Sequence, residues 1–126
     1  MIGNRVVIDS NIIILASKQE INIDRLINNY DRFYVSIITY MEVNGFKNMS
    51  NQEKQIIDRF FENIEIVDVG MEVAKIVIGY KNHPNKKIKL PDAIILATAK
   101  FVNGDLITRN INDFIDIDKT IKIESI

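Results

Sequence analysis

The fold of this chain is decided by the stretch Arg5-Val6-Val7-Ile8-Asp9-Ser10-Asn11. Its first four residues form a short run rich in β-branched side chains, which predicts a parallel strand buried on both faces. Asp9 closes this run, and Ser10-Asn11 have the character of a helix N-terminal cap, with the helix continuing to Ala16. A strand that passes directly into a helix is typical of an α/β fold.

The rest of the chain continues this alternation. Apolar residues recur at helical spacing, and Pro91 stands in a first helical turn, where its missing N–H costs nothing. The predicted helices cover residues 22–27, 37–46, 51–62, 71–80 and 91–101, and the predicted strands cover 33–35, 64–69, 106–108 and 121–123. Strands that alternate with helices predict a central parallel sheet flanked by helices on both faces.

Composition places limits on what the protein is. With 126 residues, 47% hydrophobic and 26% charged, we expect one globular domain over residues 1–126. Cysteine is absent, which excludes a disulfide framework and a thiolate zinc site. The sequence contains neither a signal peptide nor an apolar run near the roughly 18 residues that span a bilayer. We therefore expect a soluble, cytoplasmic protein without membrane contact.

Four acidic residues stand where a strand or helix end should meet a loop: Asp9, Glu42, Asp92 and Asp113. The carboxyl ends of parallel strands form the ligand crevice of such a sheet. Carboxylates gathered there would repel one another unless a cation neutralised them. Hard divalent cations such as Mg²⁺ or Mn²⁺ prefer oxygen ligands, so the pattern predicts metal-dependent cleavage of a phosphodiester.

Each of these acids also has an ordinary structural interpretation. Asp9 is a suitable cap for the following helix, and Asp92 is favoured in a first turn by the helix dipole. Glu42 is explained as a solvated helix residue and Asp113 as a turn residue. Only the combination of all four acids in one cleft favours a catalytic, metal-binding site over these structural roles.

Four motifs resemble those of PIN-domain ribonucleases and, more narrowly, the small VapC-type toxins of prokaryotic type II toxin–antitoxin pairs. They are Val7-Ile8-Asp9-Ser10-Asn11, Thr39-Tyr40-Met41-Glu42-Val43, Leu90-Pro91-Asp92-Ala93-Ile94-Ile95-Leu96-Ala97-Thr98-Ala99, and Leu106-Ile107-Thr108-Arg109-Asn110-Ile111-Asn112-Asp113-Phe114. Their order and spacing match the family over essentially the whole chain. The resemblance implies a PIN-like fold and an endoribonuclease that leaves a 5′-phosphate.

The resemblance also implies site residues and partners. Mg²⁺ or Mn²⁺ would be held by the four acids, with Ser10, Asn11, Thr39, Thr108 and Asn110 as supporting residues. Asn110 stands where many members carry aspartate, so either Asn110 or Asp113 is the fourth site residue, and the charge of Asp113 favours the latter. The implied partners are RNA, a second copy in a homodimer and an antitoxin protein.

The formal net charge of -1 means that any RNA contact must be local. Candidate phosphate contacts are Arg109, Lys86, Lys87 and Lys89, although a solvated loop explains the lysines, and a surface position explains the arginine, equally well. His83 is the only histidine, and we expect it to be exposed rather than catalytic.

Two other functional classes remain open. An aspartate after the first strand is also found as the nucleophile of phosphatases, but those enzymes need a further acid nearby, and Asp9 is followed by Ser10-Asn11. A catalytically silent PIN scaffold that binds RNA or protein is the main alternative. The RNA target, the number of ions, and the choice between a toxin and a stand-alone processing nuclease are left open by the sequence.

Overall fold

A five-stranded parallel sheet forms the centre of the computed structural model, which describes residues 4–24 and 28–126. The strands are β1 (Arg5–Ile8), β2 (Arg32–Ser36), β3 (Glu65–Val67), β4 (Asp105–Ile107) and β5 (Ile123–Glu124). Their order is β3-β2-β1-β4-β5, and every neighbouring pair is parallel. The first strand therefore lies in the middle of the sheet, and β2 and β4 lie on either side of it.

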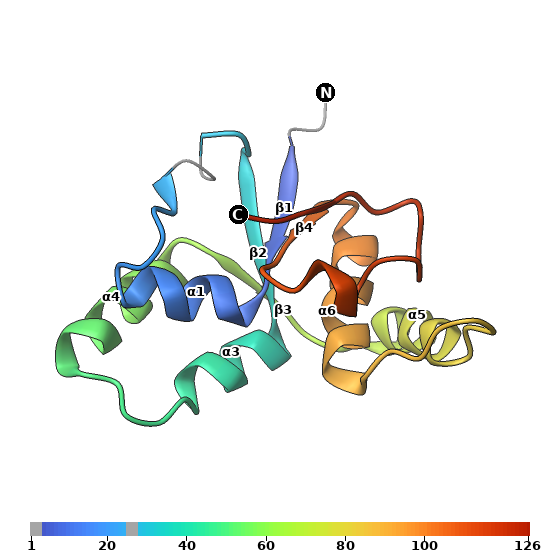
Figure 1. The fold of residues 1–126 in the computed structure, drawn as a ribbon, viewed down its shortest axis with the longest axis horizontal. Helices are drawn as coiled ribbons and strands as arrows, with labels where there is room; N and C mark the ends of the chain where they lie inside the picture. The colour runs from blue at the N-terminus through green and yellow to red at the C-terminus, as the bar shows by residue number, and fades with distance from the viewer. Residues whose placement is uncertain (1–3, 25–27) are drawn as a thin grey trace.

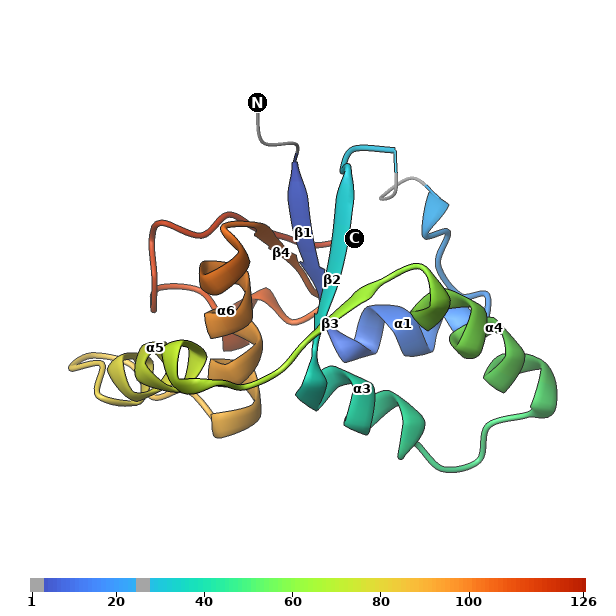
Figure 2. The same cartoon turned by 180° about the vertical axis from the view of Figure 1, so that it is seen from behind.

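Helices cover both faces of this sheet, which confirms the predicted α/β architecture of a central parallel sheet flanked by helices. They are α1 (Ser10–Ser17), α3 (Ile37–Asn44), α4 (Asn51–Glu62), α5 (Met71–Lys81) and α6 (Leu90–Val102), with a short 3₁₀ helix η1 (Ile111–Asp113). Figures 1 and 2 show α1 and α4 on one side of the sheet and α5 and α6 on the other. The helix predicted over 22–27 lies partly outside the described residues and stays a prediction.

The last strand begins later than the sequence predicted. The predicted strand covered 121–123, but β5 pairs Ile123 with Leu106 and Glu124 with Ile107. The amide of Ile121 still belongs to the preceding turn, since it donates to the carbonyl oxygen of Asp118 at 3.3 Å. Ile121 is apolar because it is buried in the core beside the strand, which explains the misplaced boundary.

Alternation along β1 explains why its residues are apolar on both faces. Val6 and Ile8 pack into the core formed with α1 and α4, whereas Val7 packs into the core formed with α5 and α6. All three side chains are at most 1% exposed. Burial of such side chains stabilises a protein by about 1.5–3 kcal/mol each, so this strand anchors both halves of the core.

Helix α6 ends in a tight turn that leads into β4. Asn103 adopts the left-handed conformation, with a φ of 59°, and the amide of Gly104 donates to the carbonyl oxygen of Ala99 at 2.9 Å. This pattern satisfies carbonyl groups that the end of a helix leaves unpaired. A Cβ atom on Gly104 would lie 2.9 Å from the backbone oxygen of Arg5, so only glycine fits at this point.

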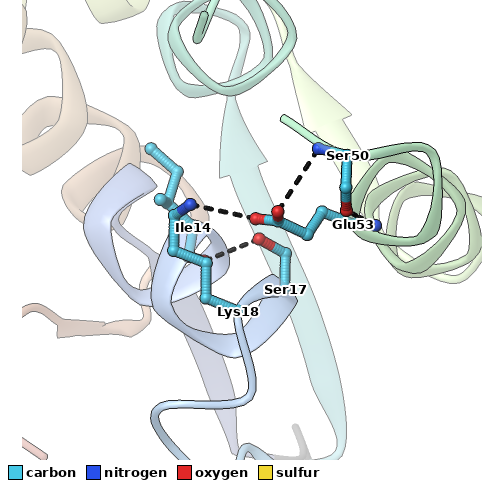
Figure 3. Close-up of polar contacts among 5 residues, drawn as sticks. All are labelled: Ile14, Ser17, Lys18, Ser50 and Glu53. Carbon is cyan, nitrogen blue, oxygen red and sulfur yellow. Dashed lines mark hydrogen bonds and ion pairs between the residues drawn. The ribbon is translucent and has the colours of Figure 1, made fainter. Parts of the chain in front are cut away.

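An ion pair joins the end of α1 to the start of α4 (Figure 3). Ser50 caps α4 by accepting a hydrogen bond from the amide of Glu53, and the Glu53 carboxylate accepts one from the amide of Ser50. The Lys18 Nζ atom lies 3.0 Å from Oε2 of the same glutamate. One carboxylate therefore completes a helix cap and holds two helices together.

The edge strand β5 is held by a buried tyrosine that precedes β2. The hydroxyl oxygen of Tyr30 lies 2.9 Å from Oδ2 of Asp105 and 3.0 Å from Oε2 of Glu124. Burial and these two carboxylates raise the pKa of Tyr30, so the phenol remains a donor. Tyr30 thus connects the segment before β2 to both β4 and β5.

No helix within residues 4–24 and 28–126 is long and apolar enough to cross a bilayer.

Candidate functional site

The four predicted acids come from four different elements near the carboxyl edge of the sheet. Asp9 directly follows β1, and Glu42 lies in α3, which follows β2. Asp92 lies in the first turn of α6, and Asp113 ends η1, which follows β4. Because β1 lies between β2 and β4, the segments that leave these strands converge around Asp9.

Asp9 is the most buried of these acids, with an exposed fraction of 5%. Its Oδ1 atom accepts a hydrogen bond from the amide of Ser10 at 2.8 Å, which makes it the N-cap of α1. Its Oδ2 atom accepts one from the Thr108 hydroxyl at 2.7 Å. Burial nevertheless raises the pKa of Asp9 above its ordinary value, and repulsion from Asp113 adds to the rise. Asp9 therefore acts as a helix cap and also lies at the centre of the acidic group.

A hydroxyl group bridges Asp9 and Glu42. The Ser10 Oγ atom lies 3.4 Å from Oδ1 of Asp9 and 3.2 Å from Oε1 of Glu42. One hydroxyl proton donates well to only one of these oxygens at a time, so the second carboxylate is left with incomplete compensation. Burial raises the pKa of Glu42, the Ser10 hydrogen bond opposes the rise, and repulsion from Asp9 contributes to it.

The convergence is clearest at Asp92. Burial raises the pKa of this carboxyl to about 6, and repulsion from Asp113, Asp9 and Glu42 contributes to the rise. Lys89, the residue before α6, partly opposes it. An acid whose pKa is raised by three other acids marks a site that favours a positive ligand.

The chemistry of this donor set fits a hard divalent cation, because every charged ligand is a carboxylate oxygen. In the conformation of the described residues, no group of three or more acidic or histidine side chains is arranged to hold a metal ion. In this conformation Oε1 of Glu42 lies 3.2 Å from the Ser10 hydroxyl oxygen.

The predicted supporting residues differ in what they contact. The Thr108 oxygen accepts a hydrogen bond from the amide of Asn110 at 3.0 Å while its proton is donated to Asp9. The Asn11 side-chain oxygen accepts one from the amide of Arg109 at 3.3 Å. The Thr39 hydroxyl is fully buried and has no hydrogen-bond partner among the described residues. The hydrogen bonds of Thr108 and Asn11 join the start of α1 to the segment after β4.

Two of the four predicted RNA contacts already have partners within the chain. Arg109 donates from Nη1 to the backbone oxygen of Ile126 at 3.0 Å. The Lys86 ammonium group donates to the carbonyl oxygens of Asn112 and Ile115. The structure gives Lys87 and Lys89 no side-chain hydrogen bond or ion pair within its described ranges. RNA contact stays a prediction for all four.

His83 has a structural role that its sequence context did not indicate. Its Nδ1 atom accepts hydrogen bonds from the amides of Asn85 at 3.2 Å and Lys86 at 3.1 Å. The only sequence feature that points to this role is the short separation between His83 and the turn residues that follow it. The side chain orders the loop between α5 and α6 and is partly buried rather than exposed.

An apolar groove of about 680 Å³ lies between α1 and α4, apart from the acids. Ile13, Phe33, Ile57 and Phe60 are among the residues that line it. None of the four acids lines this groove, although Ile8, which precedes Asp9, does. The acidic group and the groove are therefore distinct features of the surface.

Comparisons with known proteins agree with this architecture. The family model described as PIN domain matches residues 6–120. A chain of the DNA-bound VapBC from Salmonella typhimurium superposes with a TM-score of 0.79 and 21% identity, covering 97% of this chain and 98% of that one. A chain of VapBC2 from Rickettsia felis, bound to a promoter DNA fragment, gives 0.76 and 22%, covering 96% and 98%.

A toxin–antitoxin complex from Klebsiella pneumoniae is also similar. One of its chains superposes with a TM-score of 0.71 at 28% identity, covering 94% of this chain and 99% of that one. Curated proteins include no match to this sequence.

Proposed function

This chain belongs to the PIN domain family, and we propose that it is a metal-dependent endoribonuclease that acts as the toxin of a toxin–antitoxin pair. The observation that carries this proposal is the hydrogen-bonded centre of the site, where Ser10 bridges Asp9 and Glu42 and Thr108 donates to Asp9. Burial raises the pKa of Asp92, and repulsion from Asp113, Asp9 and Glu42 adds to the rise, which supports the same grouping of acids. Four mutually repelling carboxylates at the edge of a sheet are costly without a cation. Their oxygen atoms favour Mg²⁺ or Mn²⁺ as the cofactor.

Within this proposal each side chain has a definite task. Asp9 and Asp92 are the main ligands, and Glu42 and Asp113 complete the set. Ser10 and Thr108 orient the carboxylate oxygens of Asp9 through the hydrogen bonds described above. When bound, the cation supplies positive charge for the scissile phosphate and acidifies a water molecule. A carboxylate oxygen of this group that is not bound to the cation would accept the proton of the attacking water. The bond from phosphorus to the 3′ oxygen would break, that oxygen would take a proton from solvent, and the products would carry a 5′-phosphate and a 3′-hydroxyl group.

The direct test is cleavage of total cellular RNA by the purified chain in Mn²⁺, Mg²⁺ or EDTA. Asp9→Asn and Asp92→Asn remove one charge each and keep side-chain size, and asparagine preserves the α1 cap. Asp58→Asn, on the exposed face of α4, is the matched control. We expect metal-dependent cuts with 5′-phosphate ends in wild type and control, and none in the two site variants.

Equal behaviour of all four proteins across RNAs and ions would contradict the nuclease proposal. Retention of RNA binding without cleavage would indicate a silent PIN scaffold instead. Hydrolysis of a small phosphomonoester that depends on Asp9 would indicate the phosphatase alternative. The last two outcomes each indicate a different class of protein.

The toxin role and the partners rest on the similar structures, which are of toxin–antitoxin complexes. By analogy we propose an antitoxin partner, a homodimer and a cytoplasmic site of action. Induced expression of wild type should arrest bacterial growth, whereas Asp9→Asn should not. Rescue by a small protein encoded next to this gene would identify the antitoxin. Cleavage in vitro without growth arrest would favour a processing nuclease.

A further inference from the structure

Lys86 lies in the loop between α5 and α6, but its side chain reaches the turn that carries Asp113. Its Nζ atom lies 2.7 Å from the carbonyl oxygen of Asn112 and also donates to that of Ile115. These two carbonyl groups flank Asp113 in the sequence. One ammonium group therefore binds the turn on both sides of the acid.

The turn has backbone hydrogen bonds of its own, and two of them run from the amides of Phe114 and Ile115 to the carbonyl oxygen of Ile111, at 3.0 and 2.9 Å. Asp113 ends η1, a single turn of 3₁₀ helix whose amide-to-carbonyl bond from Asp113 to Asn110 is 3.0 Å long. The hydrogen bonds of 3₁₀ helices have poorer geometry than those of α-helices. Phe114, which is completely buried, anchors the turn from the core side, whereas Asp113 is exposed. These bonds hold the backbone locally, so a tertiary contact such as that of Lys86 acts on Asp113 through the carbonyl groups of the turn.

The loop that presents Lys86 is ordered by two other side chains, which make three hydrogen bonds. Nδ1 of His83 accepts hydrogen bonds from the amides of Asn85 and Lys86. Nζ of Lys81 lies 2.6 Å from the carbonyl oxygen of Ile88, whose side chain is buried. Lys86 thus extends from a fixed backbone, which reduces the conformational entropy lost when its side chain binds the turn.

We propose that Lys86 is a positioning residue for Asp113, which is a different role from the RNA contact predicted from sequence. By holding the carbonyl groups on both sides of Asp113, it keeps this carboxylate near Asp9 and Asp92. Its positive charge also lies beside the turn that carries the acid. This inference rests on the proposed function, because it treats Asp113 as a metal ligand.

Mn²⁺ titration without RNA, followed by calorimetry, tests this role. Lys86→Met removes the ammonium group and keeps a linear side chain, and Lys75→Met, on the exposed face of α5, is the matched control. Loss of a group that orients a ligand lowers metal affinity by about 10-fold or more. We expect such a loss in Lys86→Met, wild-type affinity in the control, and partial recovery in Lys86→Arg.

A double-mutant cycle separates positioning from a general structural role. If Lys86 acts through Asp113, Lys86→Met should have no further effect on Mn²⁺ affinity in an Asp113→Asn background. Amide hydrogen exchange of Phe114 and Ile115 should also be faster in Lys86→Met at unchanged global stability. If the methionine variant does not fold, Lys86→Gln allows the same comparison.

Three results would overturn the inference. Wild-type Mn²⁺ affinity in Lys86→Met, with weaker RNA binding and a salt slope lower by about one, would assign Lys86 to a phosphate. An affinity loss that persists in Asp113→Asn would assign it to the fold in general. A wild-type chain that binds no Mn²⁺ would overturn the proposed function itself, and with it this inference. The Mn²⁺ affinity of the wild type therefore distinguishes a failure of the proposed function from a failure of this inference alone.

Discussion

Asp92→Asn should stabilise the metal-free protein at neutral pH while it removes activity. Burial and three neighbouring acids raise the pKa of Asp92 from 3.8 to about 6. Each pKa unit corresponds to about 1.4 kcal/mol, so the shift represents about 3 kcal/mol. Solvent screening of a partly exposed group reduces this to about 1.5 kcal/mol, and the lost helix-dipole interaction costs about 0.5 kcal/mol. The net gain is about 1 kcal/mol, or about 4 °C in Tm.

The pH dependence has a definite sign. A raised carboxyl pKa means that the folded state binds more protons than the unfolded state between pH 3.8 and about 6. Stability in EDTA should therefore fall, through this group, as pH rises across that interval. Asp92→Asn should remove that part of the slope, whereas Asp58→Asn on α4 should not.

The assay is thermal unfolding in EDTA and in Mn²⁺ for wild type and both variants. In Mn²⁺ the wild type should gain stability by mass action, and Asp92→Asn should gain little, so their order should reverse. A variant that is less stable than wild type in EDTA, with an unchanged pH slope, would refute the reasoning. That result would mean that burial and the neighbouring acids do not destabilise the charged form of Asp92.

Three further predictions concern the framework of the site. Tyr30→Phe leaves two carboxylates without their shared donor, so chemical unfolding should show a loss of about 1.5–3 kcal/mol; an unchanged midpoint would mean that water replaces the hydroxyl group. Lys18→Met breaks the surface ion pair to Glu53 and should lower stability only slightly in the same assay, because solvent screens exposed charges, with the loss disappearing in a Glu53→Gln background. Gly104→Ala places a Cβ atom against the backbone of Arg5 and should lower stability by about 1–3 kcal/mol; wild-type thermal unfolding would show that the strand yields without strain.

The acids at the ends of elements could be predicted because their surroundings are local in sequence. Val6 to Ile8 read as a buried strand, and the carboxylate that follows such a strand must leave the sheet at its carboxyl edge. The same reasoning placed Asp92 in a first helical turn, where the structure has it. The boundary of β5 was wrong because Ile121 is apolar for core packing and not for strand pairing.

The contacts within the site depend on which segments of the chain lie side by side, and local sequence patterns do not predict this. The strand order places β1 between β2 and β4, and only this order brings Thr108 to within 2.7 Å of Asp9 across 99 residues of sequence. The same holds for Lys86, which read as one of several loop lysines until the turn at Asn112 proved to be its partner.

The sequence by itself therefore determined the alternation of strands and helices, the parallel sheet and the places of the acids at the ends of elements, because hydrophobic periodicity and capping act over a few residues. Tertiary structure alone decided that burial and the other acids raise the pKa of Asp92, that Ser10 bridges Asp9 and Glu42, and that Lys86 binds the turn of Asp113. These properties arise from packing between distant segments, where burial and Coulomb interactions depend on three-dimensional distance rather than on position in the chain.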